Sequence, residues 1–142
     1  MKKLVFAAIA AGLLVGITGC GIDDDDAKDQ LTGTQEYSSV DEIGSDLKER
    51  SIDCTPQRDS TSKVFTTSGR CTVDGTEIVF GIFTNDSQLS EYKSTINFVS
   101  TTIGEASYLV IGSNWVANCS ADQDCADQIQ GQLGGQVWTS QS

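Results

Sequence analysis

An uncharged apolar segment near the N-terminus divides the chain into a part suited to a bilayer and a part that can fold in water. Lys2 and Lys3 precede residues 4–17, whose sequence is LVFAAIAAGLLVGI. A basic start, an apolar stretch and small residues at its end are typical of a cleaved export signal. The stretch is shorter than the roughly 20 apolar residues that a stable membrane helix requires. We therefore expect residues 1–19 to be a signal peptide, and we disfavour the alternative of an uncleaved anchor helix.

A short motif that ends in a cysteine follows the apolar segment. Ile17, Thr18, Gly19 and Cys20 supply, in order, an aliphatic residue, a hydroxyl residue, glycine and cysteine. This order matches the lipobox, and the chain thereby resembles the precursors of bacterial lipoproteins. The resemblance implies that Cys20 receives a diacylglycerol thioether and becomes the mature N-terminus, outside the cytoplasm on the bacterial cell membrane. Two acyl chains, at roughly 0.8 kcal/mol per buried CH₂, give durable anchoring.

The charge of the chain limits the classes of partner. Twenty acidic and nine basic residues give a formal charge of −11, and removal of Lys2 and Lys3 with the signal leaves −13. Nucleic-acid binding needs clustered lysine and arginine, whereas the basic residues here are scattered among acids. We therefore expect no nucleic-acid partner. The same charge opposes contact with anionic headgroups, so membrane contact is expected through the lipid alone.

Four cysteines besides Cys20 predict disulfides in an exported protein: Cys54, Cys71, Cys119 and Cys125. Four cysteines allow three pairings. We favour Cys54–Cys71 with Cys119–Cys125, because each pair closes a short local loop. A four-cysteine zinc site is the alternative, but the spacing contains no C-x₂-C and the chain has no histidine. No metal and no cofactor are expected.

Composition predicts a tether before a single domain. Residues 20–37 contain four consecutive aspartates, residues 23–26, and few large apolar side chains. Too little apolar surface is available to offset the entropy of ordering, so an acidic, disordered spacer is expected. A calcium site is the alternative, but calcium loops space their ligands along a turn, and adjacent aspartates do not. Residues 38–142 are the expected domain.

Hydrophobic periodicity predicts three helices in this domain. Ser39 and Glu42 form a capping-box pattern before a short amphipathic helix over residues 40–50. A second helix over residues 87–99 follows from the helical spacing of its apolar side chains, and a third begins near Ser120 and ends at Gly134-Gly135. The expected inner stripe of the second helix consists of Leu89, Tyr92, Ile96 and Val99.

Turn chemistry predicts strands that come as hairpins. Asp74-Gly75 separates residues 70–73 from residues 76–83, and D-G is a strong hairpin signal. A preceding strand at 63–67, a second hairpin of 108–111 with 115–119, and a last edge strand at 137–139 complete the set. Hairpins make antiparallel sheets. The predicted fold is α+β: a small two-layer sandwich with the helices on one face of the sheet.

A second, weaker resemblance covers about residues 70–138. Leu-Val-Ile-Gly at 109–112, Ser-Asn-Trp-Val at 113–116 and Leu-Gly-Gly at 133–135 are similar to motifs of small uncharacterised lipoproteins of actinobacteria. These motifs mark turns and helix ends. The resemblance implies no activity.

No catalytic signature is present in the sequence. The absence of histidine excludes Ser-His-Asp and Cys-His catalysis, and no phosphate-binding glycine loop occurs. A pair of carboxylates that hydrolyses glycosides needs only two acids, so it stays formally open, but so small a domain rarely encloses a sugar cleft. We therefore do not expect an enzyme.

Two sets of residues are candidates for binding. Asp122, Asp124 and Asp127 could offer oxygens to calcium, but acids in the first turn of a helix are already explained by capping and by the helix dipole. Trp115 and Trp138 could form a binding platform, although tryptophan in a short hairpin is more often packed in the core. The ligand-binding residues therefore stay unassigned.

The function predicted from sequence is a non-catalytic envelope module that binds a protein, a peptide or a wall component. A cation- or small-ligand-binding lipoprotein is the alternative. An exposed apolar patch would favour the first, and a concave pocket with several unpaired carboxylates would favour the second.

Overall fold

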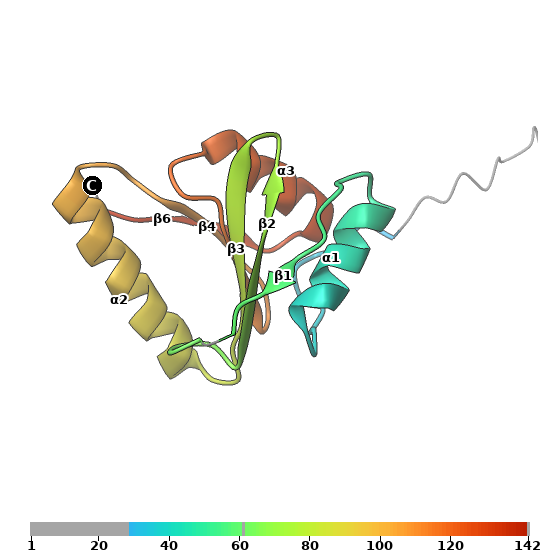
Figure 1. Ribbon diagram of the computed structural model, residues 1–142, viewed down its shortest axis with the longest axis horizontal. Coiled ribbons are helices and arrows are strands. Elements are labelled where there is room, and N and C mark those ends of the chain that lie inside the picture. Colours follow the sequence, from blue (N-terminus) through green and yellow to red (C-terminus); the bar gives the residue numbers. More distant parts are fainter. Residues whose placement is uncertain (1–28, 61, 142) are drawn as a thin grey trace, which may run out of the picture.

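The computed structural model describes residues 29–60 and 62–141. The predicted export signal, the predicted lipobox with Cys20, and the aspartates at 23–26 lie outside these residues. The described part contains three helices and six strands (Figure 1). In chain order they are α1 (Val40–Glu49), β1 (Gln57–Arg58), β2 (Thr67–Val73), β3 (Thr76–Ile82), α2 (Asp86–Ile103), β4 (Tyr108–Ile111), β5 (Trp115–Asn118), α3 (Gln123–Leu133) and β6 (Gln136–Thr139).

The six strands form one antiparallel sheet in the order β1-β2-β3-β5-β4-β6. β2 and β3 are joined at Asp74-Gly75, where φ is 50° and 85°, the left-handed values that a type I′ hairpin turn needs. β4 and β5 form the second hairpin. The predicted α+β class, with an antiparallel sheet made of hairpins, is confirmed.

Side chains alternate between two apolar clusters along the central strands. On β5, Trp115 and Ala117 belong to a large cluster with α1 and α3, whereas Val116 faces a smaller cluster on the other side. Leu89 and Tyr92 of α2 pack against this smaller cluster. α2 therefore lies on the opposite side of the sheet from α1 and α3 (Figure 1).

The placement of α2 differs from the expectation that all helices share one face. The centre of the sheet is apolar on both sides, because Leu109, Val110, Val116 and Ala117 are all fully buried. A sheet that is apolar on both faces needs cover on both faces. The sequence of residues 76–83 has apolar side chains at both odd and even positions, a pattern that is typical of a strand covered on both faces.

Residues 31–37 belong to the domain and not to a disordered tether, which corrects the predicted boundary at residue 38. Tyr37 is only 6 % exposed, and its hydroxyl donates a hydrogen bond of 2.7 Å to Asp46. Asn114 bonds to both the N–H and the C=O of Tyr37. Burial and the Asp46 bond raise the pKa of the Tyr37 hydroxyl well above its usual range. Leu31 packs against the same cluster.

Several element boundaries also differ from the sequence prediction. Residues 63–66 are a loop, and β2 runs unbroken from Thr67 to Val73. α2 continues four residues further than predicted, to Ile103. The side chain of Ser39 makes no capping hydrogen bond, while Glu42 accepts one from the N–H of Ser38 at 2.8 Å.

Gly81 on β3 tests how the smaller cluster is packed. A Cβ at this position would lie 2.4 Å from the ring of Phe65, so Gly81→Ala should force that ring aside and destabilise the domain by about 1–3 kcal/mol. Gly131→Ala is the matched control, because its Cβ would meet open space on α3 and alanine favours helix by up to about 1 kcal/mol. Urea unfolding of both variants measures the difference. Equal stability of the two variants would contradict this packing.

Candidate interaction surface

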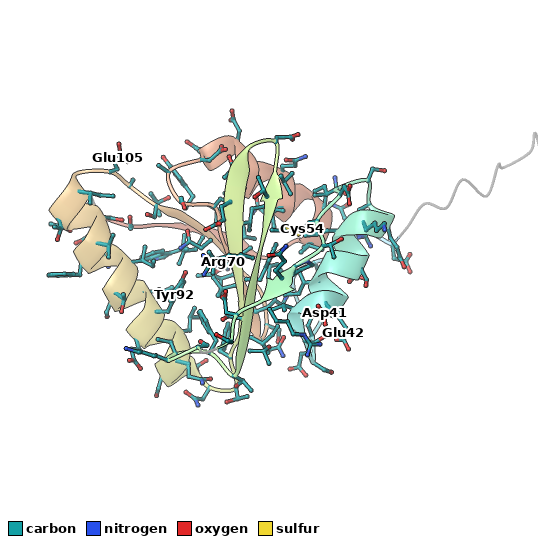
Figure 2. All side chains as sticks on the ribbon, in the orientation of Figure 1. Asp41, Glu42, Cys54, Arg70, Tyr92 and Glu105 are labelled. Atoms are coloured by element: carbon teal, nitrogen blue, oxygen red, sulfur yellow. A yellow bond between two sulfur atoms is a disulfide. The ribbon has the colours of Figure 1, made fainter. Side chains whose placement is uncertain are left out.

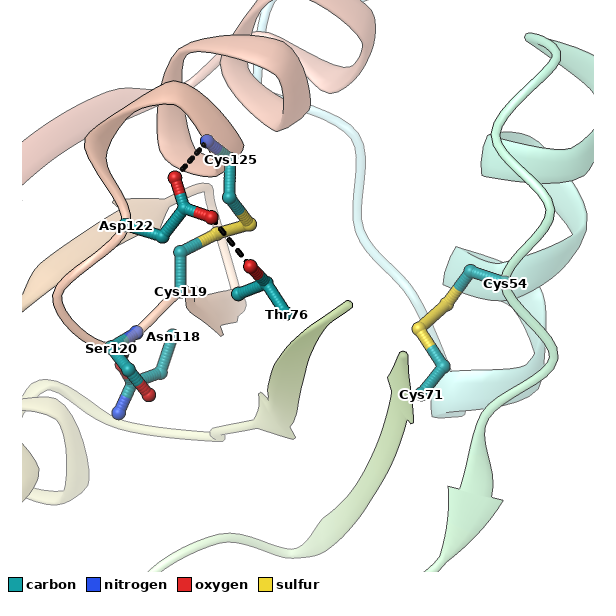
Figure 3. Close-up of a disulfide and its surroundings, with 8 residues drawn as sticks. All are labelled: Cys54, Cys71, Thr76, Asn118, Cys119, Ser120, Asp122 and Cys125. Atoms are coloured by element: carbon teal, nitrogen blue, oxygen red, sulfur yellow. Dashed lines mark hydrogen bonds between the residues drawn. A yellow bond between two sulfur atoms is a disulfide. The ribbon is translucent and has the colours of Figure 1, made fainter. Parts of the chain in front are cut away.

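The four predicted cysteines form the two expected disulfides (Figure 3). Cys54 and Cys71 join the loop after α1 to β2, with Cα atoms 5.6 Å apart. Cys119 and Cys125 join the end of β5 to the first turn of α3, with Cα atoms 5.9 Å apart. All four side chains are at least nine-tenths buried, so both bridges belong to the core.

The acidic cluster at the start of α3 caps the helix. Asp122 is the N-cap residue: its carboxylate accepts hydrogen bonds from the N–H of Cys125 at 3.0 Å and from the hydroxyl of Thr76 on β3 (Figure 3). The Thr76 bond, with the Cys125 N–H, lowers the pKa of Asp122. Helix α3 thus begins after Asp122 and not at Ser120. Asp124 and Asp127 are exposed, and no three potential metal ligands gather within the described ranges.

The two tryptophans do not form a platform. Trp115 is fully buried, packs at its ring edge against Tyr37 with centroids 6.0 Å apart, and lies against Gly112. Trp138 on β6 is partly buried on the other face of the sheet, where the ammonium of Lys93 lies 5.4 Å from its ring centroid. The platform interpretation is therefore wrong for Trp115.

A polar depression of about 430 Å³ lies beside the Cys54–Cys71 bridge, and Asp53, Arg70 and Glu77 are among its lining residues. Arg70 forms ion pairs with Glu77 at 3.2 Å and with Asp59 at 3.0 Å. The hydrogen bond from Arg70 lowers the pKa of Asp59. Glu77, one of the two carboxylates that line this depression, is therefore already paired with a cation.

An apolar patch lies on the second half of α2. Among the described residues, only three large apolar side chains are exposed: Phe98 at 74 %, Val99 at 44 % and Ile103 at 60 %. We call these three residues the α2 patch. Val99 and Ile103 are four positions apart and therefore neighbours on the helix surface, whereas Phe98 lies about 100° around the helix from Val99. The three side chains together cover an arc of about 140° on the last two turns.

Neighbouring threonines make this side of α2 less polar than its sequence indicates. The hydroxyl of Thr95 donates to the C=O of Glu91 at 3.0 Å, and that of Thr102 donates to the C=O of Phe98 at 2.7 Å. A hydroxyl that bonds its own helix backbone leaves the methyl group as the outward part of the side chain. Residues 94–104 also carry no charge in a chain with 29 charged residues.

Helix α2 is held to the sheet mainly through its first half. The ring of Tyr92 packs on Phe65 with centroids 4.6 Å apart, and its hydroxyl accepts a bond of 2.8 Å from Asn118 on β5 (Figure 2). Burial raises the pKa of the Tyr92 hydroxyl. In the second half, Ser100 is the one fully buried residue, and it bonds to Ser140 and Ser107.

The sequence analysis assigned Val99 to the inner stripe, and the structure places it at the exposed edge. Phe98 and Ile103 were not proposed as functional. The signal that could have found them is the combination of an uncharged, threonine-rich segment with a phenylalanine one position away from the apolar stripe. That combination predicts a second apolar side of the helix.

Comparison with protein-family models finds no matching family, and comparisons with curated proteins and with solved structures find no match. Within the part of the chain that the structure describes, no helix is both long enough and apolar enough to cross a membrane.

Two phenylalanines test whether the α2 patch is dispensable for folding. Phe83 is 5 % exposed in the smaller cluster, so Phe83→Ala should cost about 3–5 kcal/mol. Phe98→Ala should change the free energy of unfolding by less than about 0.5 kcal/mol, because most of the ring already contacts water. Urea unfolding of both variants measures the contrast. A loss of several kcal/mol in Phe98→Ala would mean that the ring is structural.

Proposed function

We propose that the protein is a lipid-anchored, non-catalytic module of the bacterial cell envelope that binds another protein through the α2 patch. The observation that carries the binding role is the exposure of Phe98, Val99 and Ile103 on a helix whose folding does not need them. Exposed apolar surface is costly in water, and in monomeric proteins such patches mark interaction sites. The lipobox at Ile17–Cys20 supports the anchor.

The position of the patch relative to the attachment point is consistent with a partner away from the membrane. The C=O of Asp29, the first described residue, accepts a hydrogen bond of 2.9 Å from Arg50 at the end of α1. Figure 1 places α2 across the sheet from α1. Nine residues join Cys20 to Asp29, which corresponds to a reach of at most about 30 Å. The α2 patch is therefore across the sheet from Asp29, where the described chain begins, and this supports a partner that approaches from the side away from the proposed anchor.

The charge around the patch indicates the chemistry of the partner. Glu91 lies about two turns before the patch, and it is exposed. Glu105, which follows the end of α2, is exposed as well (Figure 2). The whole chain has a charge of −11. A partner with an apolar centre and a border of lysine and arginine would match this arrangement, and opposite charges at a rim accelerate association.

The alternative function, binding of a cation or small ligand, has weaker support. The polar depression beside Cys54 is the place where such a ligand would lie, but Arg70 already pairs with Glu77 and Asp59 there. Asp122 is engaged by Thr76 and Cys125. Of the acids that sequence analysis considered for a cation at the start of α3, Asp122 thus has protein partners, whereas Asp124 and Asp127 are exposed and do not gather with other potential metal ligands among the described residues. Protein binding is therefore the function we prefer.

The anchor is tested by labelling with a radiolabelled fatty acid. Wild-type protein should take up label and remain with the membrane after a high-salt wash, because its attachment is covalent lipid. Cys20→Ala has no sulfur for the thioether, so it should take up no label. A wild-type protein without label would overturn the anchor, while leaving the α2 patch to be tested separately.

The binding surface is tested by a photocrosslinking amino acid at position 98 of the full chain in its own membranes. We expect a discrete crosslinked product that is lost when Ile103→Glu places a charge in the patch. The product should also decrease as salt is raised from about 0.05 to 0.5 M, because screening weakens attraction to a basic partner.

The same photocrosslinker at Thr72 serves as the matched control. Thr72 is exposed on β2. In the sheet, β3, β5 and β4 separate this strand from β6, and the second half of α2 is bonded to the residues that follow β6. Equal products from positions 98 and 72, or a product that Ile103→Glu leaves unchanged, would exclude the α2 patch as a specific binding surface. A thermal melt of Ile103→Glu that matches wild type excludes unfolding as the cause of a loss.

A further inference from the structure

The outer edge of β6 presents unpaired backbone groups. The N–H of Ser140 donates to the C=O of Ser107 at 2.9 Å, which makes these two residues a hydrogen-bonded pair between the ends of β6 and β4. In an antiparallel ladder such pairs alternate, so Trp138 bonds to Leu109, and the backbone groups of Val137 and Thr139 point away from β4. β6 is the last strand of the sheet, and no described residue bonds to these outward groups.

On either side of Val137 and Thr139, hydrogen bonds within the domain occupy the outward backbone groups. Before Val137, the N–H of Gly135 donates to Thr32 and its C=O accepts from the side chain of Gln130, both at 3.2 Å. After Thr139, the N–H of Gln141 donates to the side chain of Asn97 on α2 at 2.9 Å. Val137 and Thr139 are therefore the two residues whose outward N–H and C=O groups remain available.

The opposite edge of the sheet is protected, and the β6 edge is not. β1 has only two residues and directly follows Pro56, and short strands and proline are common means of blocking an edge. β6 contains neither charge nor proline, and its sequence, Gln-Val-Trp-Thr, favours strand pairing.

Apart from Lys93, whose ammonium lies 5.4 Å from the ring centroid of Trp138, the sequence segments beside β6 carry little charge. Residues 128–142, which include the second half of α3 and all of β6, have no charged side chain. Residues 94–104 of the α2 region also have none, and they contact β6 and its extension through Ser100 to Ser140 and Asn97 to Gln141. In a chain with a charge of −11, this is an edge where two copies can approach with little repulsion.

We infer that the β6 edge pairs antiparallel with β6 of a second copy of this chain. A two-fold axis between the two copies of Trp138 places Val137 of one copy opposite Thr139 of the other. All four free N–H and C=O groups of each copy then form hydrogen bonds with the opposite strand. Shifting the register by two residues in either direction would place Gly135 or Gln141 in the ladder, where their groups are already bonded. Trp138 would then lie opposite Trp138 of the second copy.

The pairing is expected to be weak in dilute solution and stronger on a membrane. A four-residue strand spans about 14 Å, and its pairing buries less than the roughly 1,200 Å² of a stable interface. Confinement of anchored copies to one surface raises their effective concentration. The strength on a membrane thus rests on the proposed anchor, whereas the register does not.

Two cysteine variants of the full chain, distinguished by tags of different size, test the register. Val137→Cys and Thr139→Cys are coexpressed, and disulfide formation in membranes is promoted with a mild oxidant. Directly opposed residues have Cα atoms about 5.5 Å apart, within the range of a disulfide. We expect the mixed 137–139 dimer to exceed both same-site dimers several-fold, and to fall as lipid dilutes the protein.

Val137→Pro in the Thr139→Cys copy is the matched control. It removes an outward N–H but no hydrogen bond to β4, so the mixed dimer should decrease several-fold while the thermal melt of the variant stays that of the parent. No excess of the mixed dimer, an excess of same-site dimers, a yield that proline leaves unchanged, or a disulfide to another protein would each overturn the inference. The same variants in concentrated detergent solution separate a failure of pairing from a failure of anchoring.

Discussion

Burial of β5 on both of its faces is the constraint from which the rest of the domain follows. All four residues of Trp115–Asn118 are buried, and they alternate between the cluster under α1 and α3 and the cluster under α2. A strand in this position cannot be stable with helices on one side only. The domain therefore needs α2 as a cover, and α2 must cross from β3 to β4 over the face that α1 and α3 leave open. The contacts of Tyr92 with Phe65 and Asn118 hold it there.

Helix α2 is longer than the smaller cluster that it covers, and this extra length explains why the α2 patch is exposed. The smaller cluster has four fully enclosed members, Phe65, Phe83, Leu109 and Val116, and the first half of α2 is enough to enclose them. The remaining turns extend past the cluster and are held by the small Ser100–Ser140 contact. Their apolar side chains lie beyond this cover, which is why Phe98, Val99 and Ile103 stay exposed.

Turn residues and cysteine spacing predicted their features correctly, whereas features that depend on tertiary packing could not be predicted from the sequence. The Asp74-Gly75 hairpin and the two disulfides followed from turn chemistry and loop length, which are properties of neighbouring residues. The order in which hairpins join, and hence the side of the sheet that α2 covers, is not a local property. The same applies to Tyr37. In the sequence it ends a polar segment, and only the fold places Asn114 and Asp46 beside it. Exposure of Val99 depended likewise on how far α2 extends beyond the cluster.

The fold brings two uncharged segments of the sequence together beside β6. Residues 94–104 and 128–142 are two separate uncharged stretches in the sequence, and neither is unusual alone. The return of the chain through β6 places them together, with Asn97 against Gln141 and Ser100 against Ser140. Elsewhere the excess of acids makes the approach of two copies unfavourable. If two copies pair as inferred, the same charge that opposes random association would favour approach along β6, where Val137 and Thr139 have outward backbone groups without a partner among the described residues.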